Sequence, residues 1–361
     1  MTRPACVVID RLAAKANLQR VRALVPRQKV MAIIKANAYG HGLTRMGEAF
    51  RDADALGVAC LEEAEVLREA GVQHPIVLLE GPFTDNELSE LQRLSIETVV
   101  HHEEQVRMLE RLSHGEPIAV WIKIDTGMHR LGFPPEQARE VWQRLSQCSH
   151  VASPLRLMTH LACAHERGHP SVGAQLGVYH EAIRGLSGEQ SIANSSGILA
   201  WPETHGDWVR PGIMLYGVSP FGDTVAADEG LRPVMTLQSE LIAVRRVRTG
   251  EAVGYGGSWR CPEDMPVGVV AMGYGDGYPR HAESGTPVLV NGKRAALIGK
   301  ASMDMLTVDL RSQPEARVGD PVVLWGEGLP VEEVARWAGT IPYELLCGVP
   351  VRARFVNRHE V

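Results

Sequence analysis

The sequence predicts an α/β protein in which an N-terminal (β/α)8 barrel of the TIM type is followed by a mainly β C-terminal domain. From residue 30 to about 217, eight short apolar runs alternate with helical patterns, which is typical of such a barrel. After about Leu231, Val- and Gly-rich runs recur at short spacing, which indicates strands joined by turns. The length of 361 residues suffices for both parts. We therefore expect domains at 1–232 and 233–361.

The predicted barrel strands are β-rich apolar runs that precede polar or helical sequence. In chain order they are 30–35, 54–60, 75–81, 96–101, 119–125, 155–160, 190–195 and 208–217. Helical patterns fill the intervals at 61–71, 85–94, 103–112, 135–145 and 172–186. Several of these segments open with acidic residues, as helix starts prefer. An open doubly wound sheet is the alternative, but the loop ANAYGHG (36–42) is not the Gly-rich turn that a nucleotide would need.

The second domain is predicted from strand patterns with only two helical segments among them. The strand patterns cover 236–247, 268–278, 286–300, 305–310, 320–328 and 351–357, and the helical ones 331–339 and 343–346. Asn291-Gly292 lies between two apolar runs, which predicts a tight hairpin. The run ACVVID (5–10) comes before the first barrel strand. We expect residues 1–10 to pair with the C-terminal domain.

Composition excludes several classes of protein. Lys plus Arg is 37 and Asp plus Glu is 43, a net charge of −6, so there is no basic footprint for nucleic acid. No apolar run reaches the length of a membrane span, and the N-terminus lacks a signal peptide's apolar core. The six cysteines are scattered without CxxC spacing, so we expect no metal site and free thiols in the cytoplasm.

Polar and cationic residues recur where the predicted barrel strands end, which is the rim that carries the chemistry of such barrels. These are Lys35, Lys123, Arg130, His160, the run Asn194-Ser195-Ser196-Gly197, and Arg210. The last two positions follow strands seven and eight, whose loops often bind phosphate. Taken singly, a strand-end lysine usually extends its ammonium into water, and a buried histidine is usually a core residue. Their convergence on one rim favours a site for a phosphorylated ligand.

Seven motifs then identify a resemblance. They are KANAYGHG (35–42), WIKIDTGMHRLG (121–132), MTHLACAHE (158–166), DWVRPGIMLYG (207–217), GYGGSW (254–259), AMGYGDGYPR (271–280) and SMDM (302–305). They closely resemble motifs of the bacterial alanine racemases, enzymes of fold-type III that depend on pyridoxal 5′-phosphate. The motifs occur in the same order over nearly the whole chain. The resemblance implies a two-base interconversion of L-alanine and D-alanine, which supplies D-alanine for peptidoglycan or serves alanine catabolism.

The resemblance assigns the two catalytic bases to Lys35 and Tyr255. Lys35 matches the lysine that holds the cofactor and handles the D-enantiomer. Only an uncharged amine attacks an aldehyde, so we expect the dry strand and nearby cations to favour that form. Tyr255 matches the base for the L-enantiomer, which needs cationic neighbours to act at neutral pH. In the family these two groups meet across a head-to-tail homodimer, so a homodimer is implied.

Other site residues follow from the same resemblance. Arg210 matches the arginine that faces the pyridine nitrogen, and with His160 it links the tyrosine to the cofactor ring. Arg130 matches the arginine near the substrate carboxylate. Lys123 matches a lysine that is often carbamylated in the family, although some members use chloride there, and the sequence does not say which applies. The remaining matches are cofactor ligands (Tyr39, Asn194, Ser195, Gly212, Ile213 and Tyr343), a substrate ligand (Met303), and an access corridor (Tyr274, Arg280 and Asp304).

Four alternative functions compete with this interpretation. Small barrel proteins that bind the same cofactor for cofactor balance lack a second domain, whereas residues 233–361 are present here. A decarboxylase of the same architecture would have an acid at the position of Arg210. A metal-dependent barrel hydrolase needs a His-x-His pair after the first strand, where Lys35-Ala36-Asn37 stands. A broad-specificity racemase is the closest rival, but such enzymes usually carry export signals. The departures at Lys300, His165 and Cys163 bear on substrate range.

Overall fold

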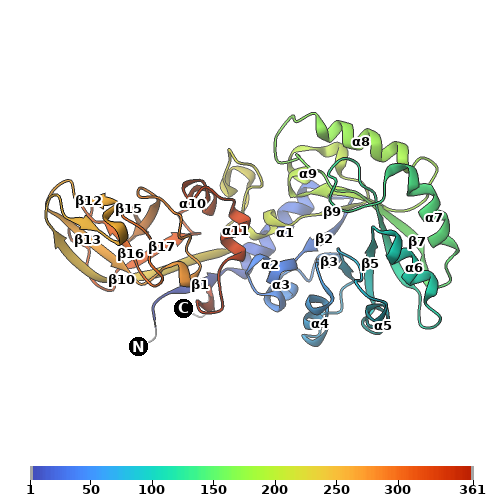
Figure 1. Cartoon of the computed structure of the whole chain (residues 1–361), viewed down its shortest axis with the longest axis horizontal. Coiled ribbons are helices and arrows are strands. Elements are labelled where there is room, and N and C mark those ends of the chain that lie inside the picture. Colours follow the sequence, from blue (N-terminus) through green and yellow to red (C-terminus); the bar gives the residue numbers. More distant parts are fainter. Residues whose placement is uncertain (1–2, 359–361) are drawn as a thin grey trace.

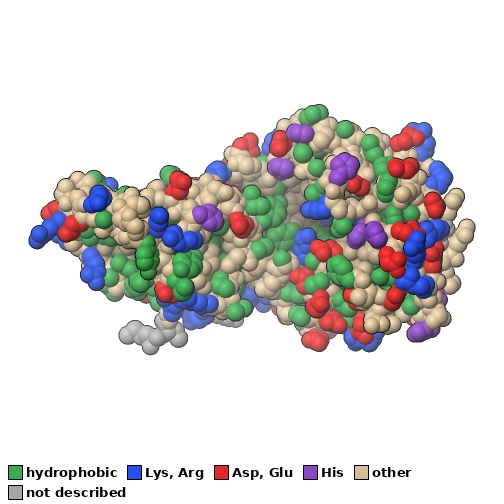
Figure 2. Space-filling view, in the orientation of Figure 1, with side chains coloured by type: hydrophobic (Ala, Val, Ile, Leu, Met, Phe, Trp, Pro, Cys, Tyr) green, Lys and Arg blue, Asp and Glu red, His purple; other side chains and the backbone are tan. Residues whose placement is uncertain are grey.

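The structure is a computed structural model that describes residues 3–358. The molecule is elongated, with a barrel at one end and a β-rich lobe at the other (Figure 1). Apolar side chains gather in the recess where the two parts meet (Figure 2). Among the described residues, no helix is long and apolar enough to cross a membrane.

The barrel consists of eight parallel strands, which confirms the predicted fold class. They are β2 (Lys29–Ile33), β3 (Ala55–Val58), β4 (Ile76–Leu78), β5 (Ile96–Val100), β6 (Ile118–Lys123), β7 (Val151–Met158), β8 (Gln190–Asn194) and β9 (Trp208–Arg210). Because β2 pairs with both β3 and β9, the sheet closes on itself.

The predicted bounds of two barrel strands differ most from the observed ones. The eighth run, 208–217, is a strand only to Arg210, because Pro211 has no N–H to give to the ladder. Residues Ile213–Tyr216 form the 3-10 turn η3 instead. The sixth strand begins at Val151, four residues before its predicted start. The shortened eighth strand leaves the Gly212 backbone at the rim.

Helices cover the outside of the barrel. They are α1 (Arg11–Leu24), α3 (Leu43–Ala49), α4 (Leu61–Glu69), α5 (Asp85–Leu94), α6 (Glu103–Arg111), α7 (Ala138–Gln147), α8 (Ser171–Ala182) and α9 (Ser195–Ala200). Helix α6 shows why these segments are helical. Its first turn holds Glu103 and Glu104 and its last holds Arg111, which suits the helix dipole. Val106 and Leu109 lie on its buried face.

The second lobe is an eight-stranded sheet in the order β13-β16-β15-β14-β17-β10-β1-β18. Its strands are β1 (Cys6–Ile9), β10 (Met235–Val247), β13 (Met265–Val270), β14 (Pro287–Val290), β15 (Lys293–Leu297), β16 (Leu306–Asp309), β17 (Pro321–Trp325) and β18 (Arg354–Asn357). Strands β11 (Ala252–Val253) and β12 (Trp259–Arg260) form a small separate sheet. Helices α10 (Val331–Trp337) and α11 (Pro342–Cys347) complete the lobe. The predicted hairpin is confirmed, because Asn291 and Gly292 join β14 to β15 with φ of 50° and 74°.

The N-terminal strand belongs to this second sheet. Strand β1 pairs antiparallel with β10 and parallel with β18. From β1 in the β lobe, the chain therefore passes into the barrel and returns to the lobe at β10. On the return it contributes α11, which lies between the two lobes (Figure 1).

Candidate active site

A cavity of about 620 Å³ lies at the carboxyl ends of the barrel strands. It brings together the barrel residues that the sequence singled out, together with one from α11. These are Lys35, Tyr39, Lys123, Arg130, His160, Asn194, Ser195, Arg210, Gly212, Ile213 and Tyr343. Parallel strands end on the same rim of a barrel, so barrel residues as far apart in sequence as Lys35 and Ile213 meet here because of topology, and α11 adds Tyr343.

Lys35 begins a turn whose backbone is left-handed, which is unusual. The sequence suggested a loop after Lys35, but Lys35–Tyr39 form the short helical segment α2. Residues 36–39 have φ of 54°, 52°, 54° and 51°, which is a left-handed turn built without glycine. Such a conformation costs about 1–2 kcal/mol per residue, so its surroundings must hold it in place.

Side chains on either side of this turn supply that restraint. The Asn37 N–H donates to the Glu63 carboxylate at 3.2 Å, and Glu63 also accepts from the Ala59 N–H at 2.9 Å. The Asn37 side-chain oxygen accepts from the Leu43 N–H at 2.8 Å. The turn is thereby tied to β3, α4 and α3, and the position of the Lys35 backbone is fixed at the cavity edge.

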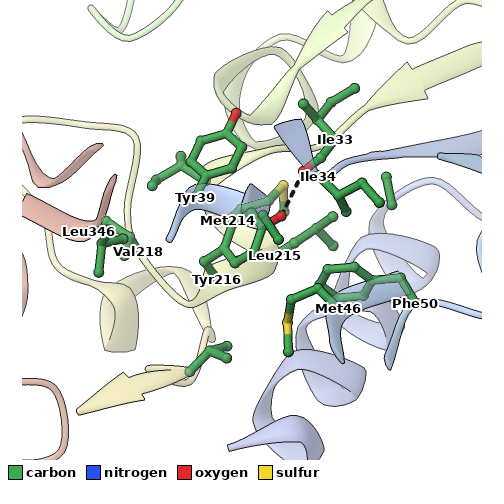
Figure 3. Packing of buried hydrophobic residues seen from close by; sticks show 14 of the residues in the cluster. Ile33, Ile34, Tyr39, Met46, Phe50, Met214, Leu215, Tyr216, Val218 and Leu346 are labelled. Atoms are coloured by element: carbon green, nitrogen blue, oxygen red, sulfur yellow. Dashed lines mark hydrogen bonds between the residues drawn. The ribbon is translucent and has the colours of Figure 1, made fainter. Parts of the chain in front are cut away.

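Tyr39 leaves the same turn and presents its hydroxyl to the cavity. Its ring stacks on Tyr216 with centroids 4.7 Å apart, and the Tyr216 hydroxyl donates to the Ile33 carbonyl at 2.9 Å (Figure 3). The Tyr39 hydroxyl points away from this apolar cluster (Figure 3). Burial raises the pKa of Tyr39, and it raises that of Tyr343 to about 12. Both phenols therefore stay protonated and can donate hydrogen bonds to an anion.

Arg210 is a buried cation, and no carboxylate among residues 3–358 forms an ion pair with it. Its side chain donates to the Ser191 hydroxyl and the Thr159 carbonyl, both at 2.7 Å, and to the Ile192 carbonyl at 3.3 Å. The distance from the same guanidinium to His160 Nδ1 is 3.4 Å. Burial lowers the pKa of Arg210 to about 10. It therefore remains charged at neutral pH, and its charge is uncompensated by the neutral groups that hold it.

The rest of the cavity adds further positive charge. Burial and the nearby Arg210 lower the pKa of Lys123 to about 8, and the same two causes hold the pKa of His160 well below its usual value. His160 is therefore a neutral ring at pH 7. Among the described residues that line the cavity, Glu80 is the only acid, against four Lys and Arg side chains. Such a site stabilises a ligand with several negative charges.

The loops after β8 and β9 meet through Ser195. The Asn194 side chain accepts from the Gly197 N–H at 3.0 Å, which caps the start of α9. Ser195 Oγ accepts from the Gly212 N–H at 2.9 Å. These contacts form a small polar floor beside the Tyr39 hydroxyl. The donors here and the cations around them fit the phosphate and the anionic ring oxygen of pyridoxal 5′-phosphate.

The other predicted site residues lie on the β lobe and do not line this cavity. The side chains of Tyr255, Met303 and Tyr274 are 69%, 52% and 40% exposed. Backbone hydrogen bonds join the Tyr274 segment to the Met303 segment, and Arg280 lines a neighbouring cleft with Lys300. Large apolar side chains exposed together mark a surface that another molecule covers.

Three residues that shape the cavity were missed in the sequence. Ser191 and Thr159 hold Arg210, and Glu63 holds the Lys35 turn. A polar residue next to apolar Ile192 in a buried strand is a usable signal, so Ser191 was open to prediction. Glu63 lies in an ordinary amphipathic helix pattern and gave no such signal.

These features define a two-domain protein whose barrel holds a cationic cavity at the carboxyl ends of its strands. The chain matches the family profiles described as "Alanine racemase, N-terminal domain" over residues 9–220 and "Alanine racemase, C-terminal domain" over 234–357. It is 53% identical over 346 residues to the biosynthetic alanine racemase of Shigella sonnei, covering 95% of this chain and 96% of that one. It is 49% identical over 355 residues to the alanine racemase of Halorhodospira halophila, covering 98% of each.

A solved structure agrees with these matches. The biosynthetic alanine racemase from Pseudomonas aeruginosa superposes with a TM-score of 0.96 at 45% identity, covering 99% of this chain and 100% of that one. The chain belongs to the alanine racemase family and is an amino-acid racemase.

Proposed function

We propose that this protein interconverts L-alanine and D-alanine with pyridoxal 5′-phosphate bound in the barrel cavity. The observation that carries the proposal is the Lys35 amine, which lines a cavity with three further cations and two phenol donors. Lys35 is the residue that would hold the cofactor covalently. Tyr39, Ser195 and Tyr343 would hold its phosphate. Bound there, the cofactor would withdraw electrons from the amino acid and make its Cα proton acidic.

Racemisation needs a proton-transfer group on each face of the substrate carbon. The cavity of one chain supplies Lys35 for one face. The second group we assign to Tyr255, which is exposed on the β lobe and does not line this cavity. Two copies arranged head to tail would bring Tyr255 of one to Lys35 of the other. The exposed Tyr274 and Met303 on the same lobe support such an interface.

Arg210 fits the proposed role of facing the cofactor's ring nitrogen. A guanidinium does not give up its proton at neutral pH, so it would not protonate that nitrogen. Its geometry is fixed by the hydroxyl and carbonyl groups that accept from it. Arg130 would meet the substrate carboxylate, with Lys123 beside it.

We place the reaction in the cytoplasm. All six cysteines are free, which supports a reducing compartment. There the product would supply D-alanine for peptidoglycan, or the enzyme would feed L-alanine into breakdown through the racemate.

The first test is the cofactor itself. Purified protein should show a yellow absorbance band that borohydride abolishes, with the reduced label on Lys35. A protein that stays colourless after addition of pyridoxal 5′-phosphate would refute the proposal. A panel of L-amino acids with the enantiomer ratio followed over time would separate this function from a broad-specificity racemase and a decarboxylase.

The second test separates the two bases. Tyr255→Phe should keep the yellow band, because Tyr255 does not line the cofactor cavity. Exchange of the Cα proton of L-alanine in D2O should fall about 100-fold or more, the usual contribution of an acid–base group, and that of D-alanine far less. Tyr274→Phe on the same surface is the matched control and should affect both enantiomers alike. An equal loss for both in Tyr255→Phe would contradict the assignment of bases.

A further inference from the structure

Asp276 is a fully buried carboxylate beneath the exposed surface that carries Tyr274 and Met303. Its side chain is 0% exposed, at the end of the 3-10 turn η6 (Tyr274–Asp276). Two arginines reach it from opposite ends of the chain. Arg3 Nη2 is 2.7 Å from one carboxylate oxygen, and Arg352 Nε is 3.1 Å from the other. A charge so deeply buried is stable only when it is paired.

The same two arginines hold the neighbouring segment 302–305. Arg3 Nη2 donates to the Asp304 carbonyl at 2.6 Å. The Arg352 guanidinium forms an ion pair with the Asp304 carboxylate. We call Arg3, Asp276, Asp304 and Arg352 the loop clamp. Its two positive and two negative side chains balance, and each arginine joins both loops.

The backbones of the two loops also lie against each other. The Tyr274 N–H donates to the Ser302 carbonyl at 3.0 Å, and the Gly275 N–H donates to the Met303 carbonyl at 2.9 Å. A Cβ on Gly273 would lie 2.4 Å from the Met303 carbonyl group, so only glycine allows this approach. The Gly273 N–H in turn donates to the Asp276 carboxylate at 3.0 Å. The backbone position of Met303 is therefore coupled to Asp276 through Gly273 and Gly275.

We propose that Asp276 is a positioning residue for substrate binding, acting on the active site of a second copy of the chain. This inference rests on the proposed function and takes Met303, the substrate ligand that the family resemblance implies, to offer its backbone N–H to the substrate carboxylate across a dimer. Through the loop clamp, Asp276 sets where that N–H stands. Because Arg3 belongs to the loop clamp, the segment before β1 also helps to position this N–H. Asp276 itself touches neither substrate nor cofactor.

The primary variant is Asp276→Asn, which keeps the shape of the side chain and removes its charge. The cofactor band and cofactor content should match wild type, because that cavity is in the barrel. KM should rise about tenfold or more for both enantiomers, the size of one displaced hydrogen bond to a charged group. The lost contact stabilises the bound substrate and the transition state equally, so kcat should change less than about threefold. Asp320→Asn, which removes a carboxylate from an exposed turn of the same lobe, is the matched control and should leave KM unchanged.

Hybrid dimers assign the effect to one active site. Lys35→Ala abolishes covalent cofactor binding on its own chain, so only the other chain's cavity can work. A Lys35→Ala/Asp276→Asn chain paired with a wild-type chain should show the raised KM. A Lys35→Ala chain paired with an Asp276→Asn chain should show the wild-type KM. The reverse pattern, or equal KM in both hybrids, would overturn the proposal.

A second variant covers the case in which Asp276→Asn does not accumulate as folded protein. Arg3 is one-third exposed, so Arg3→Gln should fold and raise KM in the same hybrid, while Arg3→Lys should restore part of the loss. No change of KM in Arg3→Gln would overturn the proposal. A wild-type protein without the cofactor band or without racemisation would instead refute the proposed function, so the two failures are distinguishable.

Discussion

Gly212→Ala is expected to weaken binding of pyridoxal 5′-phosphate through a single atom, the Tyr39 hydroxyl oxygen. A Cβ at position 212 would lie 2.5 Å from that oxygen, whereas ordinary contacts begin near 3.4 Å. The hydroxyl must therefore retreat by roughly 0.9 Å, more than a hydrogen bond tolerates. The ring has little room to follow, because it stacks on Tyr216 at 4.7 Å and faces Tyr343 at 6.0 Å.

The expected loss is one hydrogen bond from a phenol to a phosphate. A hydrogen bond to a charged group contributes about 1.5–3 kcal/mol, so the cofactor Kd should rise about 10- to 150-fold. Titration of the apoenzyme, followed by cofactor absorbance, measures this value. Gly173→Ala in α8 is the matched control, because a Cβ there meets nothing within 4 Å.

A double-mutant cycle shows whether the effect passes through the hydroxyl. If it does, Tyr39→Phe and Gly212→Ala should each weaken binding to a similar extent, and the double variant should be no weaker than Tyr39→Phe alone. Additive losses, or an unchanged Kd in Gly212→Ala, would refute the reasoning.

Three further outcomes follow from the structure. The folded pKa of Lys123, about 8, lies below its ordinary value of 10.5. Above pH 8 the unfolded chain therefore binds more protons than the folded one, so folding becomes more favourable as the pH rises. In CO2-free buffer, the free energy of unfolding of wild type minus that of Lys123→Met should increase by about 2 kcal/mol between pH 7 and 9.5. Denaturant titrations that give the same difference at both pH values would contradict this. Arg156→Met should lower the free energy of unfolding by about 2–3 kcal/mol, because Arg156 pairs with Glu97 at 2.8 Å and Glu189 at 3.2 Å; a urea midpoint like that of wild type would exclude this. Gly177→Ala in the exposed part of α8, where a Cβ would meet nothing within 4 Å, should raise the free energy of unfolding by about 0.5–1 kcal/mol and the melting temperature with it. A thermal melt with an unchanged or lower midpoint would refute this.

Much of the fold was predictable because repeated local patterns specify it. Alternation of apolar runs and helical segments sufficed for the barrel, and Asn291-Gly292 for the hairpin. The strand ends were predicted less accurately than the strands themselves. The run 208–217 is apolar throughout, and hydrophobicity alone does not distinguish a strand from the buried turn η3 that follows Pro211.

The site was predictable only in part, for two physical reasons. Topology puts strand ends on one rim, so Lys35 and Arg210 were predicted to lie on the same rim from strand order alone. The left-handed turn at 36–39 was not, because Ala and Tyr rarely adopt positive φ, and it is held by Glu63 from another helix. Tertiary contacts of this kind leave no periodic signal.

The placement of β1 has a consequence for biogenesis. During synthesis, Cys6–Ile9 leave the ribosome long before their sheet partners β10 and β18, which begin at Met235 and Arg354. At about 5–20 residues per second, this strand waits many seconds for its neighbours while the barrel forms between them. A fragment that starts at residue 233 would lack the strand between β10 and β18, and both would expose unpaired edges. The barrel is thus an insertion within the β lobe, and no single cleavage of the chain yields two complete domains.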